Sequence, residues 1–177
     1  GLIEGYTADG LIVTDTVSDD EGINIACAGI NYCTVRVKGL AAHTGYAEFG
    51  ENAILKMNKI VQAIHELDEK RGKEVIYPLF LRSGKKKSSN HVVTIYNAGT
   101  YRSSVPDWAE ILCRLGNIPG EKSEQVREEF ESVVMNIANS DEWLKENPPI
   151  IKWTRRANEA WSQNDDHPIV KTYKWAA

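Results

Sequence analysis

The sequence predicts an α+β fold in which two helices pack on one face of a four-stranded antiparallel sheet. Segments between residues 31 and 153 follow the order strand, helix, strand, strand, helix, strand. The first strand alternates apolar and polar side chains, which is typical of a sheet with one face on the core and one in water. Each helix carries a single apolar stripe. This order is that of a ferredoxin-like βαββαβ sandwich, a fold that hosts many unrelated functions.

The strand in residues 23–38 shows the clearest alternation, with Cys33 and Val35 on one face. An apolar run at residues 75–81 contains Pro78, and a proline confines such a run to the edge of a sheet. The remaining three strands are apolar runs bounded by turn residues, at 92–97, 108–115 and 150–153.

Two amphipathic helices are predicted from apolar residues at positions i, i+3, i+4 and i+7. The first spans about residues 51–70 and is expected to end with Gly72 as its C-cap. The second spans about residues 123–138 and follows a turn at Pro119 and Gly120. Because each helix has one apolar stripe, both can cover the same face of the sheet.

The composition excludes several classes of protein. Hydrophobic residues make up 42% and charged residues 26% of the 177 residues, which is ordinary for a globular domain and unlike a disordered chain. A formal charge of −4 argues against binding nucleic acid through its phosphates. No apolar run reaches the roughly 18 residues of a membrane span. Three cysteines without a CxxC motif indicate small buried side chains in a reducing compartment such as the cytoplasm, at Cys27, Cys33 and Cys113.

Among the four histidines, His91 precedes a strand in a polar loop and is expected at the surface, whereas His43 has the most distinctive surroundings. It follows the first strand, between Ala41-Ala42 and Thr44-Gly45, in a loop of small side chains. Such a loop lets another surface approach the backbone and presents the imidazole outward. An imidazole can donate a hydrogen bond to a developing oxyanion or bind a carboxylate near neutral pH. From the residues alone, a solvated loop histidine is the other interpretation.

Asp15 is a carboxylate at the end of a short apolar run, residues 11–13, that is predicted to be a buried strand. Enzymes of the α/β class place ligands and bases at such strand ends. An aspartate could hold Zn²⁺, although a catalytic zinc needs about three protein ligands. The alternative is a cap that accepts a hydrogen bond from a nearby backbone N–H.

Several segments resemble one known family. Residues 37–45 (VKGLAAHTG), continuing to residues 50–54 (GENAI), resemble the lid-domain signature of the zinc-dependent superfamily of acetylornithine deacetylase, succinyl-diaminopimelate desuccinylase, aminoacylase and carboxypeptidase G. Residues 5–15 (GYTADGLIVTD) resemble the end of the first half of its catalytic domain. Further similarity to the lid and its exit lies at 97–100, 103–107, 119–121, 143–149 and 167–170.

This resemblance implies a dimerising lid domain that is inserted into a zinc-dependent catalytic domain. It implies that Asp15 ligates zinc, and that His43 crosses the dimer interface to stabilise the tetrahedral intermediate in the partner's active site. One or two Zn²⁺ ions are expected in the parent's catalytic domain and none bound by this chain. The parent is then a deacylase or metallopeptidase, and the chain by itself is expected to be inactive.

The resemblance also assigns substrate contacts to Asn97, Ser103 and Arg114. Many relatives carry an asparagine where this chain has Ser103, three residues before Pro106. Many also carry an arginine for the substrate's carboxylate where this chain has Gly116. Arg114 lies two residues earlier, which keeps it on the same face of a strand and able to substitute for that arginine.

We therefore expect residues 1–20 to end the first half of a catalytic domain, 21–156 to form the lid and dimerisation domain, and 157–177 to begin the second half. The predicted function is the lid of a cytoplasmic, homodimeric, metal-dependent amidohydrolase that acts on N-acyl amino acids or small peptides. The alternative is a free-standing ferredoxin-like module that binds a small molecule or has a regulatory role. A reading frame with an HxD motif upstream and a ligand histidine downstream would identify the enzyme.

Overall fold

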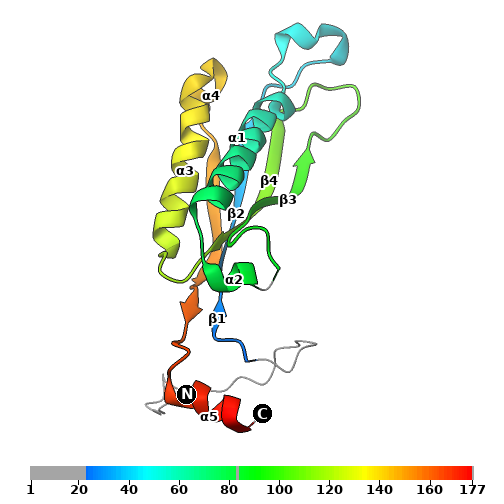
Figure 1. The fold of residues 1–177 in the computed structure, drawn as a ribbon. Coiled ribbons are helices and arrows are strands. Elements are labelled where there is room, and N and C mark those ends of the chain that lie inside the picture. The colour runs from blue at the N-terminus through cyan, green and yellow to red at the C-terminus, as the bar shows by residue number, and fades with distance from the viewer. Residues whose placement is uncertain (1–22, 83, 177) are drawn as a thin grey trace. The chain divides into compact units, whose positions relative to one another are not determined.

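The computed structural model describes residues 23–82 and 84–176. The chain divides into two compact units, of which the larger comprises Cys27–Trp161 and the smaller joins Gly1–Ala26 with Ser162–Ala177. The larger unit holds the four-stranded sheet and the two long helices (Figure 1). In the described part of the smaller unit, α5 (Pro168–Ala176) contains the buried residue Val170.

The sheet is antiparallel throughout, with the strand order β3-β4-β2-β5. Its members are β2 (Gly29–Lys38), β3 (His91–Ala98), β4 (Trp108–Asn117) and β5 (Ile150–Asn158). Two further strands, β1 (Ala26–Cys27) and β6 (Trp161–Ser162), form a separate two-stranded sheet. The predicted α+β class is confirmed. The ferredoxin-like plan fits only loosely, because β1, β6 and several short helices are additions to it.

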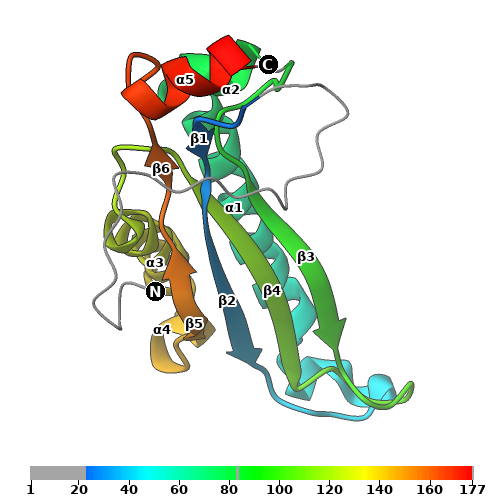
Figure 2. The ribbon, with the colours of Figure 1, turned by 90° about the horizontal axis from the view of Figure 1, so that it is seen from below.

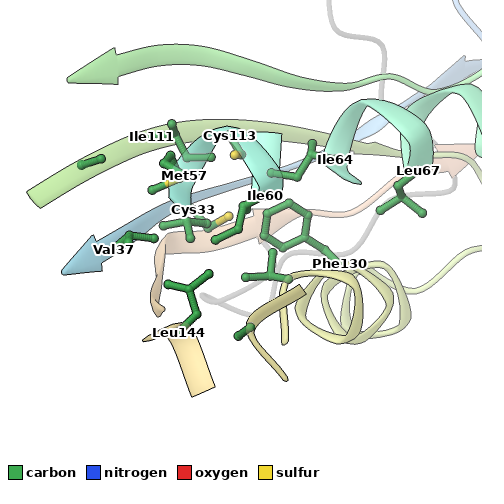
Figure 3. Packing of buried hydrophobic residues seen from close by; sticks show 14 of the residues in the cluster. Cys33, Val37, Met57, Ile60, Ile64, Leu67, Ile111, Cys113, Phe130 and Leu144 are labelled. Carbon is green, nitrogen blue, oxygen red and sulfur yellow. The ribbon is translucent and has the colours of Figure 1, made fainter. Parts of the chain in front are cut away.

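Helices α1 (Ala53–Glu74) and α3 (Ser123–Ser140) cover one face of this sheet, and Figure 2 shows the strands with both helices behind them. We call the side of the sheet opposite these helices the outer face. The alternation in β2 and β4 sends every second side chain into the helix-covered core, as predicted. Cys27 is exposed, contrary to our expectation for all three cysteines. The core cluster (Figure 3) includes Cys33, Val35, Val37, Met57, Ile60, Ile64, Ile111, Cys113, Leu115, Val126, Phe130, Val134 and Leu144.

Helix α1 begins at a clear N-cap and ends later than its sequence suggests. The Asn52 side chain accepts a hydrogen bond from the Ile54 N–H at 2.9 Å, which satisfies one free amide of the first turn. The predicted C-cap, Gly72, instead lies inside the helix. A Cβ at this position would come within 2.8 Å of carbons in the Lys87 side chain. Gly72 therefore gives a neighbouring side chain room to cross the helix, rather than ending it.

The apolar run at residues 75–81 is not an edge strand. Its second half forms α2 (Pro78–Arg82), which begins at the proline. Proline is favoured in the first turn of a helix, where its missing N–H has no helical partner in any case. The Tyr77 ring, just before this helix, packs against the Phe80 ring at 4.7 Å between centroids.

Asp141 ties α1 to α4 (Glu142–Glu146). It caps α4 by accepting hydrogen bonds from the Trp143 and Leu144 amides at 3.0 and 3.1 Å. Its carboxylate also pairs with Lys56 at 3.1 Å and Lys59 at 2.6 Å on α1. Burial would raise the pKa of Asp141, but these hydrogen bonds outweigh burial and hold the pKa well below its usual range.

A buried polar cluster lies near the C-terminal end of α1. Arg71 on α1 pairs with Glu121 at 2.7 Å and with Glu129 at 2.6 Å. The Asp68 carboxylate accepts the backbone N–H of His91 at 2.6 Å. The sequence suggested a surface position for His91, but its ring is buried at the start of β3, with Nε2 3.2 Å from the Gly116 carbonyl oxygen.

Because His91 is buried, we expect the folded chain to lose stability in mild acid. Burial disfavours its imidazolium and the Arg71 guanidinium repels that charge, so the pKa falls from 6.5 to about 4. Between these two values the unfolded chain binds a proton that the folded chain does not, and stability therefore falls as the pH is lowered. A shift of this size corresponds to about 3 kcal/mol. We expect urea unfolding to show this loss between pH 6.5 and 4.

His91→Gln should remove this pH-dependent loss of stability. His65→Gln, at an exposed position on α1, should retain it. Carboxylates titrate in the same range, so the informative quantity is the difference between the wild-type and His91→Gln free energies at each pH. A difference that stays constant from pH 6.5 to 4 would contradict the assignment.

Candidate functional site

Residues 39–51 and 99–107 meet at one end of the sheet, and we call these two segments the tip. Figures 1 and 2 show both segments at the same end of β2, β3 and β4. An isolated bridge pairs His43 with Ser104, and the Val105 N–H donates to the Ala42 carbonyl oxygen at 2.8 Å. Each segment therefore supports the backbone of the other.

The first tip segment is closed at its base. Leu40 and Glu51 exchange two backbone hydrogen bonds of 2.9 Å each, so the chain returns to its starting point before α1 begins. Gly39 makes this return possible, because a Cβ there would overlap the Glu51 carbonyl oxygen. Between these points runs a 3₁₀-helix, Thr44–Phe49, which is kinked at Tyr46 and has His43 at its N-cap.

The His43 side chain is exposed on the tip. Its Nδ1 accepts a hydrogen bond from the Gly45 N–H at 3.0 Å. Its carbonyl oxygen accepts the Tyr46 N–H at 2.8 Å, which fixes the adjoining backbone. Among the described residues Nε2 has no hydrogen-bond partner, so this nitrogen is open to an incoming group. The tip therefore exposes the Nε2 edge of the His43 ring to an incoming molecule.

Exposed aromatic residues that the sequence did not single out lie on the same tip, and the Tyr46 ring is 6.4 Å from the His43 ring between centroids. Tyr46 and Phe49 belong to the 3₁₀-helix and are 64% and 72% exposed. Tyr101, on the second tip segment, is also largely exposed, and Leu40 at the base is about half exposed. Exposed apolar groups in one region mark surfaces that contact another molecule. The sequence did offer a signal for this surface: two aromatic residues lie between the strand and the helix, in a segment with few other large side chains.

The predicted substrate residues lie in different places. Ser103 is on the tip beside His43, and its carbonyl oxygen accepts the Thr44 N–H at 3.1 Å. Asn97 is near the end of β3, opposite Glu110. Arg114 lies six residues beyond Trp108, where β4 begins, which is about 20 Å along the strand. The structure brings His43 and Ser103 together and leaves Arg114 far from both.

Arg114 occupies the outer face of the sheet, where Tyr32 on β2 and Val92 on β3 are its neighbours in register. Nearer the tip, this face is hollowed by a cavity of about 530 Å³. Arg36 in its wall lies 5.0 Å from the Trp108 ring and 3.6 Å from the Glu110 carboxylate. The cavity combines cations with apolar walls, and its lining includes Arg36, Lys38, Leu40, Trp108, Pro148 and Ile150.

A metal site is not assembled by the described residues. Within residues 23–82 and 84–176, no three His, Cys, Asp or Glu side chains gather in a group that could hold an ion. Asp15, the predicted ligand, lies outside the described residues. The helices of this part of the chain also include none that is long and apolar enough to cross a bilayer.

Comparison with known families identifies the sandwich. A family model for the M20 peptidase dimerisation domain matches residues 25–142. The chain belongs to this family. The M20 dimerisation domain is the same lid domain that residues 37–54 resemble, so the recognition from sequence is confirmed. Other members of the M20 group are peptidases and amidohydrolases, which agrees with the hydrolase class.

Two curated relatives are N-formyl-4-amino-5-aminomethyl-2-methylpyrimidine deformylases. The chain is 29% identical to the protein from Bacillus subtilis over 157 residues, and 25% identical to that from Halalkalibacterium halodurans over 167 residues. Each match covers 84% of this chain but 36% of the relative. The chain thus spans about a third of the length of these enzymes.

Solved structures share the fold at lower identity. Aminopeptidase PepT from Bacillus cereus superposes with a TM-score of 0.57 at 20% identity, covering 86% of this chain and 36% of that one. Aminobenzoyl-glutamate utilization protein from Klebsiella pneumoniae gives 0.54 at 22% identity, covering 81% and 34%. In both cases the matched part is about a third of a larger chain.

Proposed function

We propose that this M20 dimerisation domain is the lid of a homodimeric, metal-dependent amidohydrolase that hydrolyses N-acyl amino acids or small peptides. The observation that carries the proposal is the geometry of His43. Its imidazole is exposed on the tip, Nε2 faces away from the Gly45 contact, and the Tyr46 ring lies 6.4 Å away between centroids. A surface of this kind fits a site that becomes enclosed when another subunit docks against it.

In this role the Nε2–H of His43 donates a hydrogen bond to the carbonyl oxygen of the scissile amide in the partner subunit's active site. The bond strengthens as that oxygen gains negative charge, so it stabilises the transition state more than the substrate. The two-sided support of the tip backbone fixes the donor before the substrate arrives, which reduces the reorganisation needed during the reaction.

The lid is proposed to be an insertion within a catalytic domain, with residues 21–156 as the lid and residues 1–20 and 157–177 as its flanks. The sheet itself supports this. The chain enters it at the start of β2 and leaves it at the end of β5, and Ile30 is paired with Asn158. Entry and exit points that lie side by side allow one domain to be inserted into another without distortion.

The catalytic metal is proposed to lie in that catalytic domain, with Asp15 as one ligand. A bound Zn²⁺ ion there would polarise the amide carbonyl and make water a better nucleophile. What the described residues contribute is substrate contact and oxyanion stabilisation. Ser103 would contact the substrate near His43, whereas Arg114, about 20 Å along β4 from Trp108, would serve a different part of the substrate or a different active site.

Strand β3 is the proposed dimer edge. Its residues from His91 to Ala98 include no Lys, Arg, Asp or Glu, and Ile95 is 49% exposed. The other edge strand, β5, follows Pro148-Pro149 and carries Lys152. Prolines and lysines protect a sheet edge from pairing with another chain. The sheet is therefore open to a second copy along β3, across a twofold axis.

Ile95→Lys is expected to convert the dimer into a monomer, because a charge would then lie at the proposed seam. Ile150→Lys is the matched control, since Ile150 is 55% exposed on the opposite edge strand. Size-exclusion chromatography with light scattering measures both variants. A dimer that survives Ile95→Lys but is lost in Ile150→Lys would place the interface on β5 instead.

The activity itself is tested on the longer enzyme that contains this chain. Acetylornithine, succinyl-diaminopimelate, dipeptides and an N-formylated amine form a suitable panel, the last because both curated relatives are named as deformylases. We expect metal-dependent release of the acyl group or amino acid from at least one of them. No hydrolysis of any member, in a metal-loaded dimer, would count against the proposal.

A further inference from the structure

The His43 ring is held from one side by the backbone of its own loop. The Gly45 N–H lies 3.0 Å from Nδ1, and a backbone amide can only donate a hydrogen bond. Nδ1 must therefore be the unprotonated nitrogen in this arrangement. A neutral imidazole carries one proton, which places it on Nε2, the nitrogen that faces outward.

We propose that the Gly45 amide selects the Nε2–H tautomer of His43, which makes Gly45 a positioning residue for the contact with the substrate oxyanion. This inference rests on the proposed function, because it explains how a histidine on a surface loop becomes a reliable hydrogen-bond donor. Without such a contact, part of the population would carry the proton on Nδ1 and offer the oxyanion a lone pair instead.

The identity of residue 45 fits this task. A Cβ on Gly45 would lie 3.2 Å from Nδ1 and 3.5 Å from Cε1 of His43, which is tight enough to push the ring away from the amide. The rest of the loop backbone is fixed independently, because the Thr44 N–H donates to Ser103 and the Tyr46 N–H donates to His43. The glycine therefore lets the ring approach an amide that is already fixed in space.

A purely structural explanation is that His43 merely caps the 3₁₀-helix that follows it. The two explanations differ in what they require of the side chain. Asparagine is among the best N-caps, since its oxygen accepts a backbone N–H. His43→Asn should keep the hydrogen bond from Gly45 while removing the outward donor. It separates capping from tautomer selection in one substitution.

Nitrogen-15 NMR of the imidazole rings tests the inference directly on the 177-residue chain. The sequence contains four histidines, and the signal that disappears in His43→Asn assigns His43. We expect a single neutral tautomer with the proton on Nε2. In Gly45→Pro, which lacks the amide hydrogen, the two nitrogens should show averaged shifts. A wild-type His43 that is protonated on Nδ1, or that already averages, would overturn the inference.

Steady-state kinetics of the longer enzyme provide a second test of this inference. Gly45→Pro should lower kcat about 10-fold with little change in KM, the effect of losing one neutral hydrogen bond. Gly45→Ala keeps the amide and crowds the ring, so it should lower kcat without unfolding the loop. His43→Asn should lose about 10²–10³ in kcat, whereas the capping explanation requires it to stay active.

The failures of the two proposals are distinguishable. A correct tautomer together with an active His43→Asn enzyme would remove the catalytic role and leave the imidazole–amide contact standing. An averaging wild-type ring together with an inactive His43→Asn enzyme would remove the role of Gly45 and leave that of His43.

Discussion

His43→Ala in the longer enzyme is expected to lower kcat by about 10²–10³, because it removes one preorganised donor to the oxyanion. Its metal content and dimeric state should be unchanged, since His43 is neither a residue of the proposed dimer edge, β3, nor a proposed metal ligand. Steady-state kinetics with metal analysis of the purified protein measures both. An unchanged kcat would refute the proposed role of His43.

A matched control and a subunit-mixing experiment sharpen this test. His65→Ala removes another exposed histidine, from the middle of α1, and should keep wild-type kcat. His43→Ala can also be mixed with a subunit that is inactivated in its catalytic part. If His43 acts on the partner, the mixed dimers contain one complete active site and regain activity. Mixed dimers without any recovery would place the histidine in the active site of its own subunit.

Phe130→Ala is expected to destabilise the sandwich by about 3–5 kcal/mol, the usual cost of truncating a fully buried phenylalanine. The ring extends from α3 into the layer between the helices and the sheet, beside Ile60 (Figure 3). It also contacts Trp153 of β5 edge-on at 5.9 Å between centroids. Removing it leaves a cavity where α1, α3 and the sheet meet.

Trp153 is itself held in place through its indole N–H, which limits how far the cavity left by Phe130→Ala can collapse. Its Nε1–H donates to Glu131 at 2.6 Å, and the Arg127 guanidinium lies 4.9 Å from its ring. Phe49→Ala is the matched control, because that ring is 72% exposed on the tip and its loss should change stability by less than about 0.5 kcal/mol. Urea unfolding measures both, and equal losses would contradict this account of the core.

The core was predictable because burial follows from local periodicity. Alternation in β2 and the apolar stripes of α1 and α3 depend on side chains a few residues apart, which a single sequence displays. The errors share another cause. Gly72 was assigned as a helix end because its real neighbour, Lys87, comes from a distant segment. His91 was assigned to the surface because its burial depends on Arg71 and Gly116, which only the fold brings near.

The candidate site was also predictable only where it depends on residues close together in the sequence. A small-residue loop around His43 indicated an outward imidazole, and the structure places the ring exposed on the tip. The orientation of its two nitrogens depends on the Gly45 contact, which no spacing rule predicts. Arg114 is close to Ser103 in sequence, yet it lies about 20 Å along β4 from Trp108, where that strand leaves the tip. Its role stays a prediction.

The pairing of the central strand also bears on how the domain is made. Val35 in β2 is paired with Ile111 in β4 and with Ile151 in β5, so its neighbours on both sides are synthesised long after it. Contacts this distant along the chain slow folding. During translation the edge of β2 that pairs with β5 stays open until residues 150–158 have left the ribosome, even after β4 has paired with the other edge, so a nascent chain that stalls before residue 150 exposes this edge. Such a chain needs a chaperone more than the finished protein does.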